Sequence, residues 1–164
     1  MEYMYVSTIG QDSHRFGDEI AGGTTVMLGG VPVPSDKPFL ANSDGDVILH
    51  AITNAISGFT TKNVLGYSAD KLCLEEGITD STVYLKEALK DMGEAKIVHV
   101  SMSVECLTPK LKPHIEKIRQ SVANLLNLDT KSVGITATTG EGLTGFGRGE
   151  GVQVLVILTV KTPV

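Results

Sequence analysis

Two short segments of the chain carry side chains that are typical ligands of a transition metal. Asp12 and His14 stand one residue apart, and in an extended chain residues i and i+2 project from the same face. His50 follows Asp46 by four positions in a segment with helical periodicity, so these two side chains share one helix face. Two imidazoles and one carboxylate form a three-ligand set for catalytic zinc with one open position. Asp12, His14 and His50 are therefore candidate zinc ligands; the alternative is that each histidine is a surface residue or a satisfied core residue.

A glycine-rich segment near the C-terminus is a candidate phosphate site. Thr138 and Thr139 stand next to Gly140 and Glu141, and more glycines follow between residues 142 and 151. Two hydroxyls beside a carboxylate can hold phosphate oxygens together with Mg²⁺, because hard cations prefer oxygen ligands. Glycines allow the backbone to approach such a ligand closely. The alternative is an exposed loop that is rich in turns.

Two further segments offer backbone groups to a ligand. The helix expected to begin at Ser43, with Ser43 as its N-cap and Asp46 as the partner in a capping box, has free N–H groups in its first turn, around Ser43–Gly45. Such groups favour an anion, although ordinary capping explains them as well. The segment Thr108–His114 contains two prolines that restrict its backbone, and we expect it to present backbone groups to a flat base, with Lys110 near a phosphate. A helix start bounded by prolines is the alternative there.

The periodicity of apolar residues predicts the elements that position these groups. Alternation predicts strands, and spacings of three and four residues predict helices. The glycine pair at 29–30 predicts a hairpin, because a two-residue primed turn needs positive φ at both positions. We expect strands at residues 3–9, 96–106, 132–138 and 151–161, a hairpin at 26–33, helices at 43–57, after Asp80 and after Pro113, and a loop over most of 58–79.

The strand expected at 96–106 has one apolar side. Val98, Val100 and Met102 fall on that side, and Ile97 and His99 fall on the other. Strands and helices are mixed along the chain without repeats or a linker. The pattern predicts an α/β (α+β) fold, in which residues 1–164 form one domain with a single mixed sheet and helices packed on one face.

The composition argues against several classes of function. The net charge of −5 argues against broad nucleic-acid binding, which needs a basic surface. No run reaches the ~18 apolar residues of a membrane span, and the first ten residues are not built like a signal sequence. Cys73 and Cys106 are far apart and lack metal-ligand spacing, which favours two reduced thiols. We therefore expect a cytoplasmic protein without nucleic-acid or membrane partners.

The order of these motifs along the chain is more specific than any one of them. The runs are Gly10-x-Asp12-x-His14-Arg15-Phe16, Ser43-Asp44-Gly45-Asp46-x-x-x-His50-Ala51, Thr108-Pro109-Lys110-x-x-Pro113-His114, Ala137-Thr138-Thr139-x-Glu141 and Gly147-Arg148-Gly149-Glu150-Gly151. Together they resemble the 2-C-methyl-D-erythritol 2,4-cyclodiphosphate synthase family of non-mevalonate isoprenoid biosynthesis, over nearly the whole chain. The resemblance implies a metal-dependent cyclisation of 4-diphosphocytidyl-2-C-methyl-D-erythritol 2-phosphate with release of CMP. It also implies a homotrimer whose active sites lie between neighbouring subunits.

The resemblance further implies roles for individual residues. Asp12, His14 and His50 would hold Zn²⁺, and Glu141 would hold Mg²⁺ or Mn²⁺ together with the substrate diphosphate. Positions 42 and 139, here Asn42 and Thr139, contact phosphate groups during catalysis. Segment 106–112 reads cytosine, largely through backbone groups, and Arg148 faces a cavity on the trimer axis that accepts isoprenoid diphosphates. The substrate contacts implied are Asp12, His14, Ser43, Gly66, Cys106, Leu107, Thr108, Pro109, Lys110, Leu111, Lys112, Thr138, Gly140, Glu141 and Arg148.

Several positions depart from the family pattern. Asn42 stands where the family has a phosphate-contacting histidine, and an amide cannot carry positive charge. The family's Gly-Asp-Ile-Gly segment, whose Asp holds the ribose, matches Asn63-Val64-Leu65-Gly66, and its Phe-Pro-Asp-Thr-Asp segment matches Tyr67–Lys71. Asn54 replaces a helix Asp, and Thr8 replaces a Gly.

These departures leave three functions open. The complete metal set favours an active but diverged synthase with reduced turnover. The second is a non-catalytic relative that binds a cytidine nucleotide or an isoprenoid diphosphate. The third is a zinc hydrolase that acts on a nucleotide diphosphate.

Overall fold

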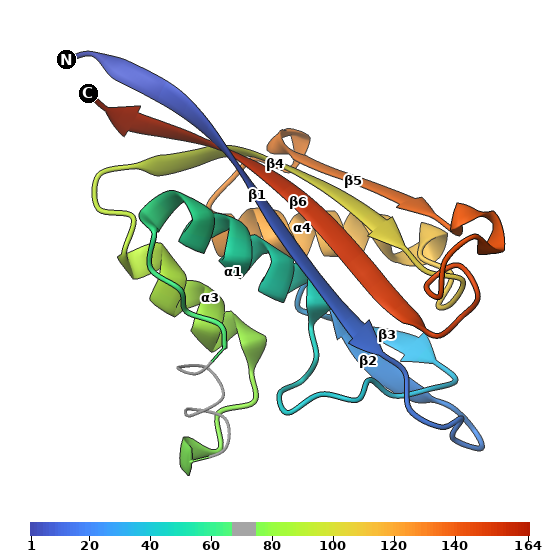
Figure 1. Ribbon diagram of the computed structural model, residues 1–164. Helices are drawn as coiled ribbons and strands as arrows, with labels where there is room; N and C mark the ends of the chain where they lie inside the picture. The colour runs from blue at the N-terminus through green and yellow to red at the C-terminus, as the bar shows by residue number, and fades with distance from the viewer. Residues whose placement is uncertain (67–74) are drawn as a thin grey trace.

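Four strands form the main sheet in the computed structural model, which describes residues 1–66 and 75–164 (Figure 1). Their order is β1-β6-β4-β5, with bounds Tyr3–Arg15 for β1, Gly151–Pro163 for β6, Lys96–Glu105 for β4 and Val133–Thr138 for β5. Strand β6 runs antiparallel to both β1 and β4, whereas β4 and β5 are parallel. The mixed sheet that the sequence predicts is confirmed.

The helices cover one face of this sheet (Figure 1). They are α1 (Val47–Thr60), which contacts β1 and β6, α4 (Ile115–Leu126), which contacts β5, and α3 (Ser81–Lys90), which packs on α1. Short 3₁₀ turns lie at Lys112–His114 (η1), Thr130–Ser132 (η2) and Gly140–Gly142 (η3). The helices bury the inward residues of β6, which are Val152, Val154, Val156, Leu158 and Val160. Among the described residues, no helix is both long enough and apolar enough to cross a membrane.

Strands β2 (Thr24–Leu28) and β3 (Val31–Ser35) form a separate two-stranded sheet. The turn between them, Gly29-Gly30, has φ angles of 66° and 81°, as the hairpin prediction requires. The hairpin therefore adds a second, smaller sheet to the single sheet expected from the sequence. Its buried side chains, Leu28 and Val33, join the same core as the helices.

Strand β1 continues past its expected end near Gly10 and reaches Arg15. Asp12 and His14 therefore lie on a regular strand, paired with Val154 and Val152 of β6. Gly10 has another role, because α1 crosses the strand there and a Cβ on Gly10 would lie 2.0 Å from the carbonyl oxygen of Ala51. The glycine permits close packing of helix on strand and does not end the strand.

Strand β4 departs from strict alternation near its start. Its pairing with β6 shifts register between Ile97 and His99, as at a β-bulge, so that Ile97 and Val100 are both buried. The prediction that Ile97 shares a side with His99 is wrong for this reason. In the expected loop, residues 61–66 form no helix or strand, and the segment Tyr67–Lys71 lies outside the described residues.

Candidate active site

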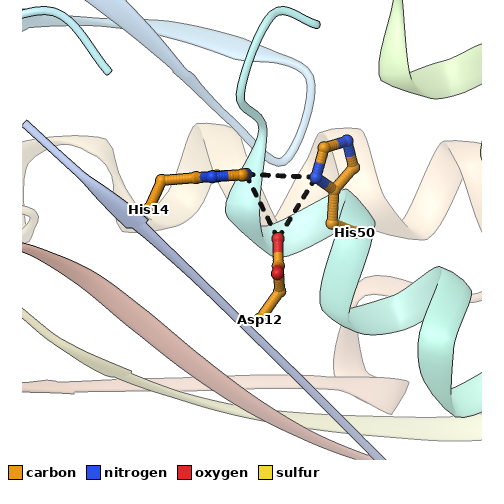
Figure 2. Close-up of side chains that lie close together, drawn as sticks. All are labelled: Asp12, His14 and His50. Carbon is orange, nitrogen blue, oxygen red and sulfur yellow. Dashed lines mark hydrogen bonds and ion pairs between the residues drawn. The ribbon is translucent and has the colours of Figure 1, made fainter. Parts of the chain in front are cut away.

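Asp12, His14 and His50 meet between β1 and the first turn of α1 (Figure 2). The Nε2 atom of His14 and the Nδ1 atom of His50 each lie 3.2 Å from Oδ2 of Asp12. The two ring nitrogens also lie 3.2 Å from each other. Three donor atoms from two distant segments thus form a nearly regular triangle, and the prediction that these residues converge is confirmed.

The triangle has the dimensions of a metal site. Zinc bonds of about 2.0–2.1 Å in a tetrahedron separate neighbouring ligand atoms by roughly 3.3–3.4 Å. The observed separations of 3.2 Å are close to this value. In the part of the chain that the structure describes, no other group of three His, Cys, Asp or Glu side chains is placed to hold a metal. The donor set therefore fits a tetrahedral ion with one position left for a ligand.

The two imidazoles change the acidity of Asp12. Burial raises the pKa of this carboxyl, but hydrogen bonds to His14 and His50 and the charges of these rings outweigh burial and bring the pKa to about 2. Asp12 therefore stays an anion at physiological pH. A permanent carboxylate beside two imidazole nitrogens is an arrangement that a divalent cation stabilises.

Asp46 fixes the start of α1 and is not part of the metal group. It is fully buried, and its carboxylate accepts hydrogen bonds from the N–H groups of Leu49 at 3.0 Å, Gly29 at 2.8 Å and Gly30 at 2.7 Å. Burial raises the pKa of Asp46, and the three N–H donors act in the opposite direction. One side chain thus caps the helix and fastens the β2–β3 turn to it. The prediction that Ser43 is the N-cap is wrong, because Asp46 satisfies both elements at once.

The N–H groups of Ser43–Gly45 were expected to bind an anion. The N–H of Asp44 donates to the carbonyl of Thr79 at 2.8 Å, and the N–H of Gly45 donates to the hydroxyl of Ser43 at 3.2 Å. These two donors are used within the chain and are not free to bind an anion, which favours the capping alternative at Asp44 and Gly45. Ser43 lies on the wall of the cavity beside the metal ligands.

A cavity of about 870 Å³ opens beside the metal ligands. The predicted site residues on its wall are Asp12, His14, Asn42, Ser43, His50 and Gly66. The remaining wall residues are Leu40, Ala41, Asn54, Asn63, Leu65 and Tyr84. Ligand pockets for small molecules commonly have volumes of about 300–1,000 Å³, so this cavity is large enough for a nucleotide-sized ligand.

The cavity distinguishes two neighbouring residues of the ribose segment. Asn63 lies on the cavity wall, whereas Val64 packs on the hydrophobic core and beside Tyr84. In the motif correspondence given above, Val64 occupies the position of the family's ribose-binding Asp. In the folded chain the polar side chain that reaches the cavity from this segment is Asn63.

The predicted base-reading segment lies at the end of β4. The N–H groups of Cys106 and Leu107 donate to the carbonyls of Thr138 and Phe146, at 3.1 Å and 3.0 Å, so both are used within the chain. Burial raises the pKa of the Cys106 thiol to about 11, so this thiol is protonated at neutral pH.

The next residues of this segment line a different cavity. Its volume is about 310 Å³, and Thr108, Pro109 and Lys110 form one wall, opposite residues of the β2–β3 hairpin and the turn before it. Leu111 is buried beneath the segment, and Lys112 opens η1. Residues 108–110 are therefore the part of the segment that lines a cavity.

The predicted phosphate segment follows β5, next to residues 106–107. The hydroxyl of Thr138 accepts a hydrogen bond from the N–H of Gly140 at 3.0 Å. Glu141 is exposed and has a φ of 55°. Arg148 lies 3.5 Å from the carboxylate of Glu150 and donates to the carbonyl of Gly142 at 3.3 Å.

Gly147 keeps the phosphate segment compact. A Cβ on Gly147 would lie 2.4 Å from the carbonyl oxygen of Thr139, so the backbone of the loop at Gly147 packs directly against the backbone at Thr139. The loop is therefore a packed unit that displays Thr139 and Glu141 at the surface, rather than an open turn.

The predicted residues thus fall into two groups within one chain. The first surrounds the metal ligands, and the second comprises segments 106–112 and 138–148. No residue of the second group is on the wall of the 870 Å³ cavity.

Sequence reasoning missed two residues at the metal site. The hydroxyl of Ser81 lies 2.7 Å from Nε2 of His50, and Asp44 binds Ser81 in turn. The sequence shows that Asp80 caps a helix here, and Asp80 does accept from the N–H of Thr82 at 2.9 Å. It does not show that this helix start lies against His50, because that contact depends on the packing of α3 on α1.

Comparison with known proteins identifies relatives across almost the whole chain. The chain is 48% identical to the 2-C-methyl-D-erythritol 2,4-cyclodiphosphate synthase of Chlamydia caviae, over 97% of this chain and 90% of that protein. A solved synthase in a CDP-bound form matches 93% of this chain and 98% of its own, with 30% identity and a TM-score of 0.74. The bifunctional IspDF from Campylobacter jejuni matches 99% of this chain over 43% of its own length, with 28% identity and a TM-score of 0.86.

The family model described as the YgbB family matches residues 5–161. This range includes the three metal ligands, the ribose segment, the base-reading segment and the phosphate segment. The chain therefore belongs to the YgbB family, the family of the 2-C-methyl-D-erythritol 2,4-cyclodiphosphate synthases.

Proposed function

We propose that this chain converts 4-diphosphocytidyl-2-C-methyl-D-erythritol 2-phosphate to 2-C-methyl-D-erythritol 2,4-cyclodiphosphate and CMP. An oxygen of the 2-phosphate attacks the β-phosphorus, and the bond from this phosphorus to the oxygen bridging it to the α-phosphorus breaks. CMP leaves with that oxygen, so no protein nucleophile is needed. The triangle of Asp12, His14 and His50 on the wall of a nucleotide-sized cavity carries this proposal.

The chain's own side chains position the reacting phosphates. Zinc, when held by Asp12, His14 and His50, supplies positive charge that neutralises phosphate oxygens and orients them. Asn42 and Ser43 lie on the same cavity and donate hydrogen bonds from an amide and a hydroxyl. These local donors are needed because the net charge of −5 gives no attractive field for a phosphorylated substrate.

We assign the second metal and the remaining phosphate contacts to the loop after β5. Glu141 offers an exposed carboxylate to Mg²⁺ or Mn²⁺. The substrate diphosphate would supply further oxygen ligands to the same ion. Thr138 and Thr139 hold phosphate oxygens through their hydroxyl groups, and Gly140, whose N–H donates to the Thr138 hydroxyl, lets the backbone approach the phosphate. Arg148 adds a cation at the far side of the same loop, where Glu150 pairs with it.

We infer that segment 106–112 reads cytosine through backbone groups at Thr108, Pro109 and Lys110, which line the smaller cavity. Cytosine offers an amino donor where uracil offers a carbonyl acceptor. A wrong base therefore leaves a buried partner unpaired, at a cost of about 1–3 kcal/mol. Calorimetry is expected to show tighter binding of CDP than of UDP, and equal affinities would remove base recognition from the proposal.

We propose a homotrimer in which the two groups of site residues meet across a subunit contact. The outer face of β1 and β6 supports this assembly, because large apolar side chains are exposed there: Tyr5 at 65%, Ile9 at 65%, Leu155 at 41% and Ile157 at 51%. An apolar patch of this kind on a sheet marks a protein contact. Light scattering is expected to give three times the chain mass of 17.4 kDa, and a monomer at micromolar concentration would contradict the assembly.

The turnover is expected to be slow because Asn42 stands where the family has a histidine. Asn42 keeps a hydrogen-bond donor but carries no positive charge, and complete removal of one such donor typically lowers kcat by roughly a hundred- to a thousandfold, which sets the upper limit of the loss. The test follows substrate, CMP and cyclic product by phosphorus NMR, with zinc and magnesium present, for the natural chain and for Asn42→His. Cyclic product from the natural chain, formed faster by Asn42→His, supports the proposal.

Two other outcomes of this test would favour other functions. Tight binding of CDP without product in either protein favours a nucleotide-binding relative, for which the replacement of histidine by Asn42 is the structural argument. An open-chain product that takes up ¹⁸O from labelled water favours a hydrolase.

A further inference from the structure

The second ring nitrogen of His50 has a partner that the known ligand set does not include. Its Nε2 atom lies 2.7 Å from the hydroxyl of Ser81, the first residue of α3, and Ser81 is fully buried. The hydroxyl of Ser43 lies at 3.5 Å from the same nitrogen, at the limit of a hydrogen bond. Ser81 is therefore the main partner of His50 on the side that faces away from Asp12 and His14.

Ser81 is itself held by a carboxylate. Its hydroxyl bonds to Oδ1 of Asp44, and its N–H donates to Oδ2 of the same residue at 3.0 Å. Asp44 is fixed in turn, because its own N–H donates to the carbonyl of Thr79 at 2.8 Å and its Oδ1 accepts from the N–H of Asp46 at 3.0 Å. The segments before α1 and before α3 are thus joined behind the metal ligand.

The chemistry of these groups sets the direction of each hydrogen. A carboxylate only accepts, so the hydroxyl of Ser81 donates its single hydrogen to Asp44. The oxygen of Ser81 is then an acceptor toward His50, and Nε2 of His50 must carry the hydrogen between them. The lone pair of the neutral ring consequently lies on Nδ1, which is the atom that points at Asp12 and His14.

We propose that Ser81 and Asp44 are positioning residues that hold His50 in the Nε2–H tautomer and aim its Nδ1 lone pair at the metal. The inference rests on the zinc site of the proposed function and extends it to two residues outside the ligand set. In many metal sites a carboxylate accepts a hydrogen bond from the second ring nitrogen of a histidine ligand and so orients the imidazole. Here the hydroxyl of Ser81 lies between the carboxylate of Asp44 and the ring of His50. Asp44 acts through Ser81, and Ser81 acts through His50.

The test compares Ser81→Ala with Ser57→Ala. Ser57 is a matched control, because it is also a buried serine, lies on the same helix as His50, and has a hydroxyl without a hydrogen-bond partner among the described residues. Competition with a zinc chelator is expected to show roughly 10–100-fold weaker zinc binding for Ser81→Ala. Ser57→Ala is expected to bind zinc like the natural chain. Ser81→Thr retains the hydroxyl and is expected to recover most of the affinity.

A second readout needs no metal. Nitrogen NMR of the metal-free protein at pH 8 reports the tautomer of His50, whose signals are identified by their absence in His50→Ala. The natural chain is expected to show the Nε2–H form, and Ser81→Ala a mixture of both forms with an unchanged fold by circular dichroism. An unchanged tautomer in Ser81→Ala overturns the inference even if zinc binding is weakened. A natural chain that shows the Nε2–H form but binds no zinc overturns the metal site and leaves the hydrogen-bond direction supported.

Discussion

At the residue scale, metal binding depends on three side chains that the backbone brings together. Donor atoms of Asp12, His14 and His50 stand 3.2 Å apart. Two of them come from one strand and the third from a helix, so the loss of one ligand leaves an incomplete set that the rest of the site cannot replace. The contribution of each ligand can be measured directly.

Replacement of the helix ligand is expected to abolish stoichiometric zinc. The natural chain is expected to bind about one zinc per chain, since three protein ligands with one open position form the usual catalytic set. His50→Ala is expected to bind none after dialysis. His99→Ala, at an exposed position of β4, is the control and is expected to keep its zinc. Elemental analysis of the three purified proteins measures the difference, and full zinc in His50→Ala would contradict the assignment.

Zinc affinity is expected to fall as the pH falls from 8 to 5. Both imidazoles must be neutral to bind, so protons compete with the metal at mildly acid pH. Asp12 adds no further proton in this range, because its pKa is lowered to about 2 and the carboxyl remains ionised. The affinity is therefore expected to decrease continuously as the pH falls. A chelator titration at several pH values measures the decrease, and an affinity that does not change with pH would exclude histidine ligands.

The ribose segment gives a prediction for two adjacent positions. Asn63→Asp is expected to lower the KM for the substrate, since its side chain lies on the cavity and a carboxylate accepts hydrogen bonds from ribose hydroxyls. Val64→Asp is expected to lower the stability by about 1–3 kcal/mol or more, because it would put a charge against the core and Tyr84. Steady-state kinetics and thermal unfolding measure the two effects. A lower KM in Val64→Asp with normal stability would contradict this assignment, because residue 64 would then face the substrate instead of the core.

Spacing along the chain predicts the metal ligands because their geometry is local. Asp12 and His14 need only an extended strand, and His50 needs only a helix. The choice between Ser43 and Asp46 as N-cap could not be made in this way, since both are good capping residues. Asp46 takes the position because the hairpin supplies two more N–H donors, and that contact is tertiary.

At the element scale, the crossing of α1 over β1 places the helix ligand above the strand ligands. The crossing is close because Gly10 has no side chain where the helix backbone passes, beside Ala51 and Ala55. The extension of β1 beyond this point puts Asp12 on the same side of the strand, next to the helix. A small residue in the strand thus determines where His50 lies.

Gly10→Ala is expected to destabilise the fold and to weaken zinc binding together. The added Cβ would lie 2.0 Å from the carbonyl oxygen of Ala51, so helix and strand must separate. Such overpacking typically costs about 1–3 kcal/mol. Gly134→Ala in β5 is the control, since the nearest atom to its added Cβ lies 3.8 Å away. Chemical denaturation and chelator competition measure both quantities, and a stable Gly10→Ala with normal zinc affinity would refute the role of this contact.

The elements themselves follow from the sequence more completely than their contacts do. Strand β6, the β2–β3 turn and α4 match the predicted patterns, because each has a regular apolar period or a glycine pair. The bulge near Ile97 does not, since it depends on the register with β6. The packing of Ser81 against His50 likewise depends on how α3 lies on α1, and no local pattern reports it.

At the scale of the whole molecule, the central claim is that a metal-dependent cyclisation site is assembled from two chains. Glu141 and the other residues of the phosphate loop are not on the wall of the cavity that the metal ligands line. We propose that, in a ring of three identical chains, the metal group of one chain faces the phosphate group of the next. The composition and the single-chain elements cannot reveal this, because it is a property of the assembly.

Complementation between two inactive variants tests this claim most directly. His50→Ala removes the metal group of a site, and Glu141→Ala removes the carboxylate of the phosphate group. Each variant alone is expected to form little cyclic product. After the two are mixed in equal amounts, dissociated and reassembled, about a quarter of the sites should combine an intact group from each chain, since one contact in every mixed trimer does so. Formation of cyclic product and CMP at about a quarter of the natural rate is the result predicted; no gain over the separate variants would contradict a site shared between chains.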